Sequence, residues 1–277
     1  MSKSSKLILV GAGPGDPELI TIKGLKALKE ADYILYDGLV NLMILDLAER
    51  DLNDDKIIFV GKKSGESYKQ KQINELILKL LQQGNNVVRL KGGDPLVFGR
   101  ASEEIEIAQQ NGFGFEVIPG LTSAFGLASL HNISLTLRNK SDSVTLVTGH
   151  EINTKKLKLW AEIINSGATL VIYMGIGNIV KISQDISLDI DPKTPAVVIA
   201  NGSLLDEKII LSSINNLAQD IINNNISSPA LIYLGHNLNF KNVVKNFYKN
   251  HNLSSLINNN LAGQEIPIHT SVMSNKN

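Results

Sequence analysis

The chain has 277 residues, of which 43% are hydrophobic and 19% are charged. Its 27 Lys and Arg residues balance 27 Asp and Glu residues, which argues against nucleic acid as the main partner. The chain has no cysteine, which excludes disulfides, thiolate catalysis and cysteine metal sites. The apolar run after the polar N-terminus is too short for a signal peptide, and no segment approaches the length of a membrane span. We therefore expect a soluble, cytoplasmic protein without a nucleic-acid or membrane partner.

Short apolar segments rich in β-branched residues alternate with amphipathic segments along the chain. The short segments are bounded by Gly, Pro or Asn, and their continuous apolarity is typical of strands covered on both faces in a mostly parallel sheet. The predicted strands are residues 7–10, 33–36, 57–60, 87–90, 115–118, 144–147, 169–173, 196–200 and 230–234. Apolar residues at helical spacing predict helices over residues 73–81, 157–164 and 214–222, with Gly84 and Gly167 as caps of the first two. This alternation predicts an α/β fold.

The chain is expected to form two layered units that meet at the turn after the fifth predicted strand. This turn reads Pro119–Gly120, so the two α/β domains are predicted over residues 1–119 and 120–250. From His251 onward the sequence loses periodicity and fills with Asn, Ser and Lys. We expect residues 251–277 to be a disordered tail.

A glycine-rich loop, residues 11–17, follows the first predicted strand and precedes a helix. That position suggests a dinucleotide-binding turn and hence an NAD-type oxidoreductase. However, the position that must be glycine for close helix packing is Asp16, and Pro14 and Pro17 lack the amide donors that a pyrophosphate needs. The plainest alternative is a strand-to-helix turn capped by Asp16, but the density of Gly and Pro favours a backbone edge that a ligand approaches closely.

A second loop, residues 92–99, follows the strand that is predicted over residues 87–90. It is therefore expected at the carboxyl edge of the sheet, where open α/β sheets bind ligands. Gly92 and Gly93 can offer backbone hydrogen bonds, and Asp94 could place a negative charge near a sulfonium or cap a following helix. Basic residues that suit an anionic co-substrate bracket the loop, namely Arg89, Lys91 and Arg100.

Six segments, in this order, resemble the uroporphyrinogen-III C-methyltransferases, which belong to the S-adenosylmethionine-dependent tetrapyrrole methylases. They are VGAGPGDPELITIKG, ADYILYD, VGKKSG, VVRLKGGDPLVFGR, EVIPGLTSA and SVTLVTGH. The resemblance covers residues 7–234, and the RLKGGDPxVFGR wording is normally absent from the related precorrin, diphthine and ribosomal-RNA methyltransferases. It implies two α/β domains with an active-site cleft between them, S-adenosylmethionine bound in that cleft, and a homodimer.

The same resemblance implies methylation of two ring carbons of uroporphyrinogen III, which gives precorrin-2 by way of precorrin-1. Precorrin-2 feeds the biosynthesis of sirohaem, cobalamin and haem d1. The alternatives are a sister methyltransferase that acts on a later precorrin or corrinoid intermediate and a binding protein that keeps only the cofactor pocket. The NAD-type oxidoreductase ranks far below these because of Asp16 and Pro14.

The resemblance also implies roles for individual residues. Asp37 and Lys62 match the acid/base candidates of the family, and its substrate-side residues match Arg100, Glu103 and Arg138. Pro229 and Ala230 are expected to close the adenine end of the cofactor site. The implied cofactor contacts are Pro14, Gly92, Gly93, Asp94, Val97, Thr122, Ser123, Met174, Gly202 and Ala230.

The chemistry of methyl transfer agrees with these residue types. The methyl group of a sulfonium is displaced in line and the leaving group departs neutral, so we expect no metal and no covalent enzyme intermediate. The enzyme must orient the methyl carbon against a nucleophilic ring carbon, and a base such as Asp37 or Glu103 can take the proton that the ring then loses. Arg100 and Arg138 suit a polycarboxylate substrate, because a guanidinium binds a carboxylate in a two-pronged geometry.

Several of these residues have plainer interpretations. Asp37 could equally cap the turn after its strand, and a lone lysine such as Lys62 is usually solvated. Met174, at a strand end, is usually a core residue, and only the resemblance suggests a cofactor contact. We expect a structural role for His150, which has no evident acid or hydroxyl partner, and we expect His131 to be an exposed loop residue.

The chain departs from the family pattern at residues 131–138. The family usually reads AGIPLTHR there, whereas this chain reads HNISLTLR, so that Ser134 replaces a proline and Leu137 a histidine while Arg138 is kept. Gly38 replaces the Ala or Arg that usually follows ADYILYD. These departures lie on the substrate side of the implied site and not on its cofactor side.

Overall fold

The computed structural model describes residues 5–63, 66–67, 70–238 and 273–274. The chain divides into two compact units, Met1–Ser123 and Ala124–Asn277. The domain boundary that we expected at Pro119–Gly120 lies on the loop that ends the first unit. The tail expected over residues 251–277 lies outside the described residues, apart from Met273–Ser274. None of the described helices is long and apolar enough to cross a membrane.

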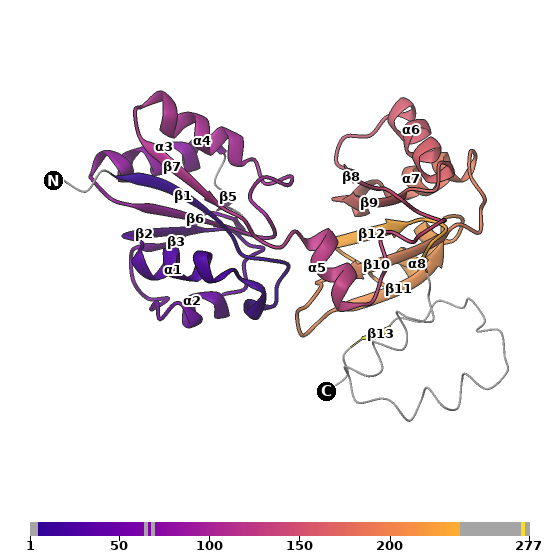
Figure 1. The fold of residues 1–277 in the computed structure, drawn as a ribbon, viewed down its shortest axis with the longest axis horizontal. Helices are drawn as coiled ribbons and strands as arrows, with labels where there is room; N and C mark the ends of the chain where they lie inside the picture. The colour runs from indigo at the N-terminus through magenta and orange to yellow at the C-terminus, as the bar shows by residue number, and fades with distance from the viewer. Residues whose placement is uncertain (1–4, 64–65, 68–69, 239–272, 275–277) are drawn as a thin grey trace. The chain divides into compact units, whose positions relative to one another are not determined.

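The first unit is built on a five-stranded parallel sheet with strand order β3-β2-β6-β1-β7 (Figure 1). The strands are β1 (Lys6–Gly11), β2 (Tyr33–Tyr36), β3 (Ile57–Phe59), β6 (Val87–Lys91) and β7 (Gly114–Ile118). A separate two-stranded sheet pairs β4 (Lys62–Lys63) with β5 (Glu66–Ser67). Because all five long strands run the same way, the loops that follow them gather at one carboxyl edge.

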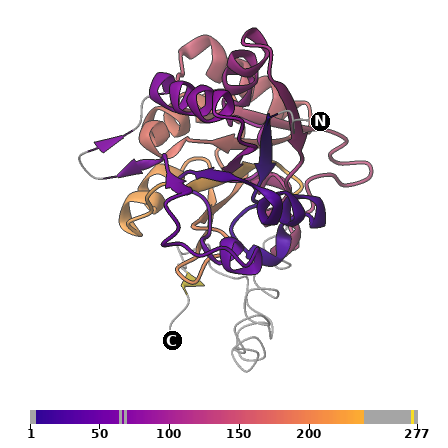
Figure 2. The same ribbon diagram turned by 90° about the vertical axis from the view of Figure 1, so that its left-hand side faces the viewer.

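Helices cover both faces of this sheet (Figure 2). They are α1 (Ile22–Glu30), α2 (Met43–Leu47), α3 (Gln70–Gln82) and α4 (Ala101–Gln110). Side chains alternate along a strand, so Ile8 and Val10 of β1 pack against α1 and α2 while Leu7 and Leu9 pack against α3 and α4. Gly84 follows α3 with φ +87°, so the predicted glycine cap is confirmed.

The second unit is built on a six-stranded mixed sheet with strand order β13-β11-β10-β12-β9-β8. The strands are β8 (Val144–Thr148), β9 (Thr169–Tyr173), β10 (Pro195–Ala200), β11 (Lys208–Ser213), β12 (Ala230–Leu234) and β13 (Met273–Ser274). The helices are α5 (Ser123–Leu130), α6 (Thr154–Asn165), α7 (Ile179–Ser187) and α8 (Leu217–Asn223). Helices α6, α7 and α8 pack on one face of the sheet and α5 packs on the other.

The α/β class is confirmed, but the mostly parallel arrangement is wrong for the second sheet. There β8 and β9 run parallel, whereas the pairs β9–β12, β12–β10 and β10–β11 are antiparallel. Continuous apolarity reports burial on both faces and not strand direction, which explains the error. The sequence prediction also missed β11 and began the last helix at Ile214, although α8 starts at Leu217.

Candidate active site

The loops after β1, β6 and β7 meet at the carboxyl edge of the first sheet, and backbone hydrogen bonds join the first two of them. The Gly93 amide donates to the Gly13 carbonyl at 2.7 Å, and the Gly13 amide donates to the Gly93 carbonyl at 3.2 Å. The Ala12 amide donates to the Lys91 carbonyl at 2.8 Å, which extends the β1–β6 pairing into the loops. The two glycine loops singled out from the sequence therefore form one continuous edge.

Glycine is required here because the backbones of the three loops almost touch. A Cβ atom on Gly120 would lie 2.3 Å from the Gly93 carbonyl oxygen and 2.6 Å from the Gly11 Cα atom. A Cβ atom on Gly92 would lie 2.8 Å from the Cβ atom of Leu39. These distances are too short for any side chain, so Gly11, Gly92 and Gly120 serve loop-to-loop packing in addition to any ligand.

The carboxylate of Asp94 connects two of these loops. Its Oδ2 atom accepts a hydrogen bond from the Gly120 amide at 3.1 Å, and its Oδ1 atom accepts one from the Leu96 amide at 2.9 Å. The suggested helix cap at Asp94 is wrong, because α4 begins after Arg100. The capping role of Asp16 is confirmed, since its side chain accepts from the Glu18 amide at 2.9 Å at the start of a 3₁₀ turn, Pro17–Leu19.

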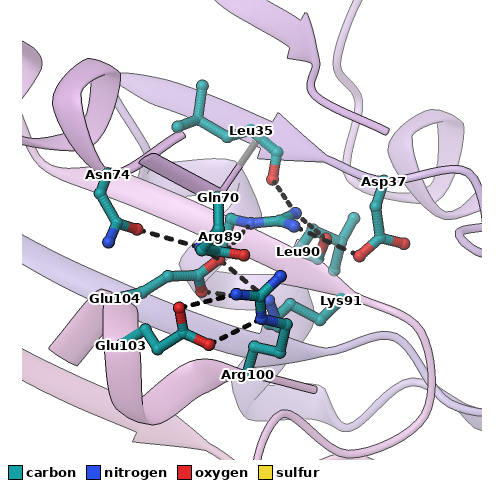
Figure 3. Close-up of polar contacts among 10 residues, drawn as sticks. All are labelled: Leu35, Asp37, Gln70, Asn74, Arg89, Leu90, Lys91, Arg100, Glu103 and Glu104. Carbon is teal, nitrogen blue, oxygen red and sulfur yellow. Dashed lines mark hydrogen bonds and ion pairs between the residues drawn. The ribbon is translucent and has the colours of Figure 1, made fainter. Parts of the chain in front are cut away.

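Two of the three basic residues that bracket the second loop are buried in ion pairs. Arg89 and Lys91 are 3% and 4% exposed, and both pair with Glu104 of α4, which is fully buried (Figure 3). The expectation that they attract an anionic co-substrate is therefore wrong. Residues two apart on a strand point to the same face, and α4 covers that face here. Burial and the neighbouring Arg89 lower the pKa of Lys91, while Glu104 opposes this shift.

Asp37 lies directly after β2, and its side chain is 24% exposed. Its Oδ1 atom accepts from the Leu39 amide at 3.2 Å, which is the turn cap that the sequence suggested. Its Oδ2 atom lies 3.3 Å from the NH2 nitrogen of Arg89, an ion pair that sequence reasoning missed. The side chain of Lys62, the other acid/base candidate, lies outside the described part of the structure.

Arg100 and Glu103 form a two-pronged ion pair at the start of α4. The Arg100 Nε atom lies 2.6 Å from Glu103 Oε1, and the NH2 atom lies 2.8 Å from Oε2. Arg100 itself adopts the left-handed region with φ +55°. The guanidinium lowers the pKa of the Glu103 carboxyl, but both side chains are largely exposed, so solvent screens the pair.

The remaining first-unit candidates lie on the same edge. The Val97 amide donates a hydrogen bond to the Asp94 carbonyl at 3.2 Å, and Thr122 is buried on the loop after β7. A Cβ atom on Gly93 would meet the Ser123 hydroxyl oxygen at 3.5 Å, which is ordinary contact. The structure therefore brings the first-unit cofactor candidates together, with Pro14 on the adjoining β1 loop.

Three second-unit candidates gather at one edge of the second sheet. Met174 follows β9 with φ +52°, and it is 49% exposed rather than part of the core. Ala230 begins β12 beside the last residue of β10, and Gly202 follows β10 on the next loop. The Asn201 amide also donates to the Pro229 carbonyl at 3.0 Å. The neighbouring α5 packs so closely that a Cβ atom on Gly202 would lie 2.3 Å from the Leu127 side chain.

Arg138 is not brought together with those residues. It is exposed on a tight turn closed by two backbone hydrogen bonds between Leu137 and Ser141, at 2.7 and 2.8 Å. The turn is anchored near the first residue of β9, because the Thr169 hydroxyl lies 2.7 Å from the Leu135 carbonyl. Met174 follows the last residue of β9, whereas the turn that carries Arg138 is held near the first. Arg138 and Met174 are therefore placed at opposite ends of β9, which are opposite edges of the second sheet.

His131 is 4% exposed, so the expectation of an exposed loop residue is wrong. Its Nε2 atom lies 3.0 Å from Glu207 Oε2, and that oxygen also accepts from the Ser203 amide at 2.6 Å. The partner is 76 positions away in sequence, so no local pattern could reveal it. His150 is exposed, and its carbonyl accepts from the Asn178 side chain at 3.1 Å. Among the described residues, no group of three or more His, Cys, Asp or Glu side chains could hold a metal ion.

These features define an α/β protein of two units with a glycine-lined loop edge on a parallel sheet. Residues 6–218 match the family model of the tetrapyrrole (corrin/porphyrin) methylases, and the chain belongs to this family. It is 41% identical to a uroporphyrinogen-III C-methyltransferase of Methanocaldococcus jannaschii over 85% of this chain and 98% of that protein. It is also 41% identical to a siroheme synthase of Saccharophagus degradans, but this chain spans only about half (51%) of the length of that relative.

A solved structure also resembles this chain closely. It is a uroporphyrin-III C-methyl transferase from Thermus thermophilus complexed with S-adenyl homocysteine. The TM-score is 0.70 at 35% identity, and the match covers 84% of this chain and 98% of that chain.

Proposed function

We propose that this protein transfers methyl groups from S-adenosylmethionine to two ring carbons of uroporphyrinogen III, giving precorrin-2 by way of precorrin-1. The observation that carries the proposal is the near full-length match to the Methanocaldococcus jannaschii enzyme, which at 98% of that protein leaves little of it without a counterpart here. Membership of the tetrapyrrole methylase family supports the same substrate class. A homodimer is part of the proposal, and sedimentation equilibrium should then give twice the chain mass.

The residues of the first sheet edge fit S-adenosylmethionine. Gly92, Gly93 and Ser123 give this edge small side chains next to the Asp94 carboxylate, and backbone groups, hydroxyls and one carboxylate suit a nucleoside and an amino-acid moiety. We assign cofactor contacts there to Pro14, Gly92, Gly93, Asp94, Val97, Thr122 and Ser123. For the second unit, we assign them to Met174, Gly202, Pro229 and Ala230.

When bound, the cofactor supplies an electrophilic methyl group, and a carbon–carbon bond forms as the carbon–sulfur bond breaks and a neutral thioether leaves. The ring then loses a proton, and Asp37 is our assigned acceptor because Arg89 holds its carboxylate at the sheet edge. Lys62 is assigned as the second acid/base group. Arg100 and Arg138 are assigned to substrate carboxylates, with Glu103 orienting Arg100 through their two-pronged pair.

The purified chain should bind S-adenosylhomocysteine saturably and should methylate uroporphyrinogen III under anaerobic conditions. With isotopically labelled S-adenosylmethionine, mass spectrometry should find two labelled methyl groups on each product molecule. Absence of a methylated tetrapyrrole would count against the proposal. Preference for a later corrinoid precursor in a substrate panel would favour the sister activity, and saturable binding of a nicotinamide dinucleotide would favour an oxidoreductase.

Arg138→Ala should raise the KM for uroporphyrinogen about tenfold, because one charge-assisted carboxylate contact is lost. Its affinity for S-adenosylhomocysteine, measured by calorimetry, should stay within about twofold of the unsubstituted chain, since the second-unit cofactor candidates lie at the opposite sheet edge. Lys140→Ala is the matched control, because it removes another exposed cation from the same turn. Loss of cofactor affinity in Arg138→Ala would contradict this division of roles.

A further inference from the structure

Four charged side chains of the first unit form a connected group beneath the sheet edge, which we call the buried charge cluster (Figure 3). It consists of Asp37 after β2, Arg89 and Lys91 of β6, and Glu104 of α4. The side chains of the last three are at most 6% exposed, so the cluster reaches the surface at Asp37, whose side chain is 24% exposed.

Glu104 is the centre of this cluster, and its carboxylate is fully buried. Its Oε1 atom accepts from Arg89 Nε at 3.1 Å, from Lys91 Nζ at 3.0 Å and from Gln70 Nε2 at 3.3 Å. Its Oε2 atom accepts from Lys91 Nζ at 3.1 Å. A carboxylate held by donors from two other elements has a fixed position and cannot itself reach a substrate.

Arg89 links Glu104 to Asp37 by direct side-chain contacts, and three hydrogen bonds determine its orientation. Its Nε atom faces Glu104, and its NH1 atom donates to the carbonyls of Leu35 at 3.3 Å and Leu90 at 3.0 Å. The guanidinium is planar and rigid, so these contacts fix the direction of the remaining NH2 atom. That atom lies 3.3 Å from Asp37 Oδ2.

The fold alone does not explain such a cluster. Burying charges carries a desolvation penalty, and apolar residues of similar volume often give equal or greater stability. However, the cluster orients the Arg89 guanidinium toward the partly exposed carboxylate of Asp37, at the edge where the glycine loops meet. Its arrangement is therefore better explained by the placement of Asp37.

We propose that Glu104 is a positioning residue for the methyl transfer, acting through Arg89 to hold the Asp37 carboxylate where it accepts the proton from the ring. This inference rests on the proposed function and adds a buried residue to it. Glu104 touches neither substrate nor cofactor. Removing its charge should therefore slow the chemical step and leave cofactor binding unchanged.

The test compares Glu104→Gln with the double variant Lys91→Met/Glu104→Gln in the full chain. The double variant removes one positive and one negative charge, so it leaves no unpaired charge from the Lys91–Glu104 pair and should fold even where the single variant does not. In the folded variants, kcat for methylation should fall about tenfold or more, since a displaced catalytic group has effects of this order. The KM for S-adenosylmethionine should stay within about twofold. Glu106→Gln, an exposed neutralisation on the same helix, is the control and should keep full activity.

A further comparison separates positioning from a general structural effect. Residues that act as a unit are non-additive, so Glu104→Gln or the double variant should cost little further activity when Asp37 is already Asn. Additive losses, unchanged kcat in a folded variant, or unfolding of the double variant would each overturn the inference. If the unsubstituted chain does not methylate uroporphyrinogen III, the proposed function fails and the inference with it. If that chain is active and only the Glu104 results disagree, the inference alone fails.

Discussion

Gly120→Ala is expected to lower the free energy of unfolding by about 3 kcal/mol or more and to abolish binding of S-adenosylhomocysteine. The new Cβ atom would lie 2.3 Å from the Gly93 carbonyl oxygen and 2.6 Å from the Gly11 Cα atom. All the atoms in conflict belong to the backbone, so no change of rotamer can relieve the overlap. The β1, β6 and β7 loops would have to separate, which would also break the bond from the Gly120 amide to Asp94. Urea unfolding and calorimetric titration measure the two effects.

Gly114→Ala is the matched control, because it lies at the other end of β7. A Cβ atom there would come no nearer than 3.9 Å to the Lys6 Cβ atom. Stability should be unchanged or should rise by about 0.5 kcal/mol, since alanine reduces the entropy of the unfolded chain. If Gly120→Ala were as stable as Gly114→Ala and still bound the ligand, the close packing of the three loops could not be essential.

The first sheet could be predicted almost completely from the sequence. Each of its five strands was expected within two residues of its observed limits, because each is a short apolar segment between clear turn signals. The position of the second glycine loop at the carboxyl edge followed from the parallel arrangement, whereas its backbone pairing with the first glycine loop was not predicted. The sequence did not reveal that Gly11 and Gly120 pack against each other, since that contact joins loops far apart in the chain.

The second sheet was predicted less well, because strand direction depends on pairing and not on composition. The connection between β10 and β11 is short, residues 201–207, and a short connection favours an antiparallel hairpin. The segment Lys208–Ser213 carries the apolar run of a strand, so recognising it would have predicted that hairpin. Joining Ile214 to the following helical pattern was wrong, because Ile214 is a buried core residue just before α8.

The partners of the buried charges in the candidate site could not be predicted from the sequence. Arg89 and Lys91 interrupt an otherwise apolar strand at a spacing of two, and this pattern was already a signal of burial toward one face. It could not identify Glu104 as the partner, since several acids on α4 were available at similar spacing. By contrast, Arg100 and Glu103 lie within one helical turn, so local spacing makes their ion pair predictable.

Asn237→Ala is expected to lower the free energy of unfolding by about 2–3 kcal/mol and to weaken use of the tetrapyrrole several-fold. Asn237 is 6% exposed, and its Nδ2 atom donates to the Ser134 carbonyl at 2.6 Å. Its Oδ1 atom lies 2.9 Å from the Thr169 hydroxyl, which also lies 2.7 Å from the Leu135 carbonyl. The substitution therefore removes both side-chain hydrogen bonds of a buried amide and loosens the loop that carries Arg138. Urea unfolding and the KM for uroporphyrinogen III measure the two effects.

Asn165→Ala is the matched control, since this exposed side chain also donates to one carbonyl, that of Asp189, at 2.9 Å. Water can replace that bond, so the loss of stability should stay within about 0.5 kcal/mol and the KM should not change. Affinity for S-adenosylhomocysteine should be unchanged in both variants, because Met174, Gly202 and Ala230 lie at the opposite edge of the second sheet. If Asn237→Ala weakened cofactor binding and spared the tetrapyrrole KM, the loop would serve the cofactor, and the assignment of Arg138 to the substrate would have to be reversed.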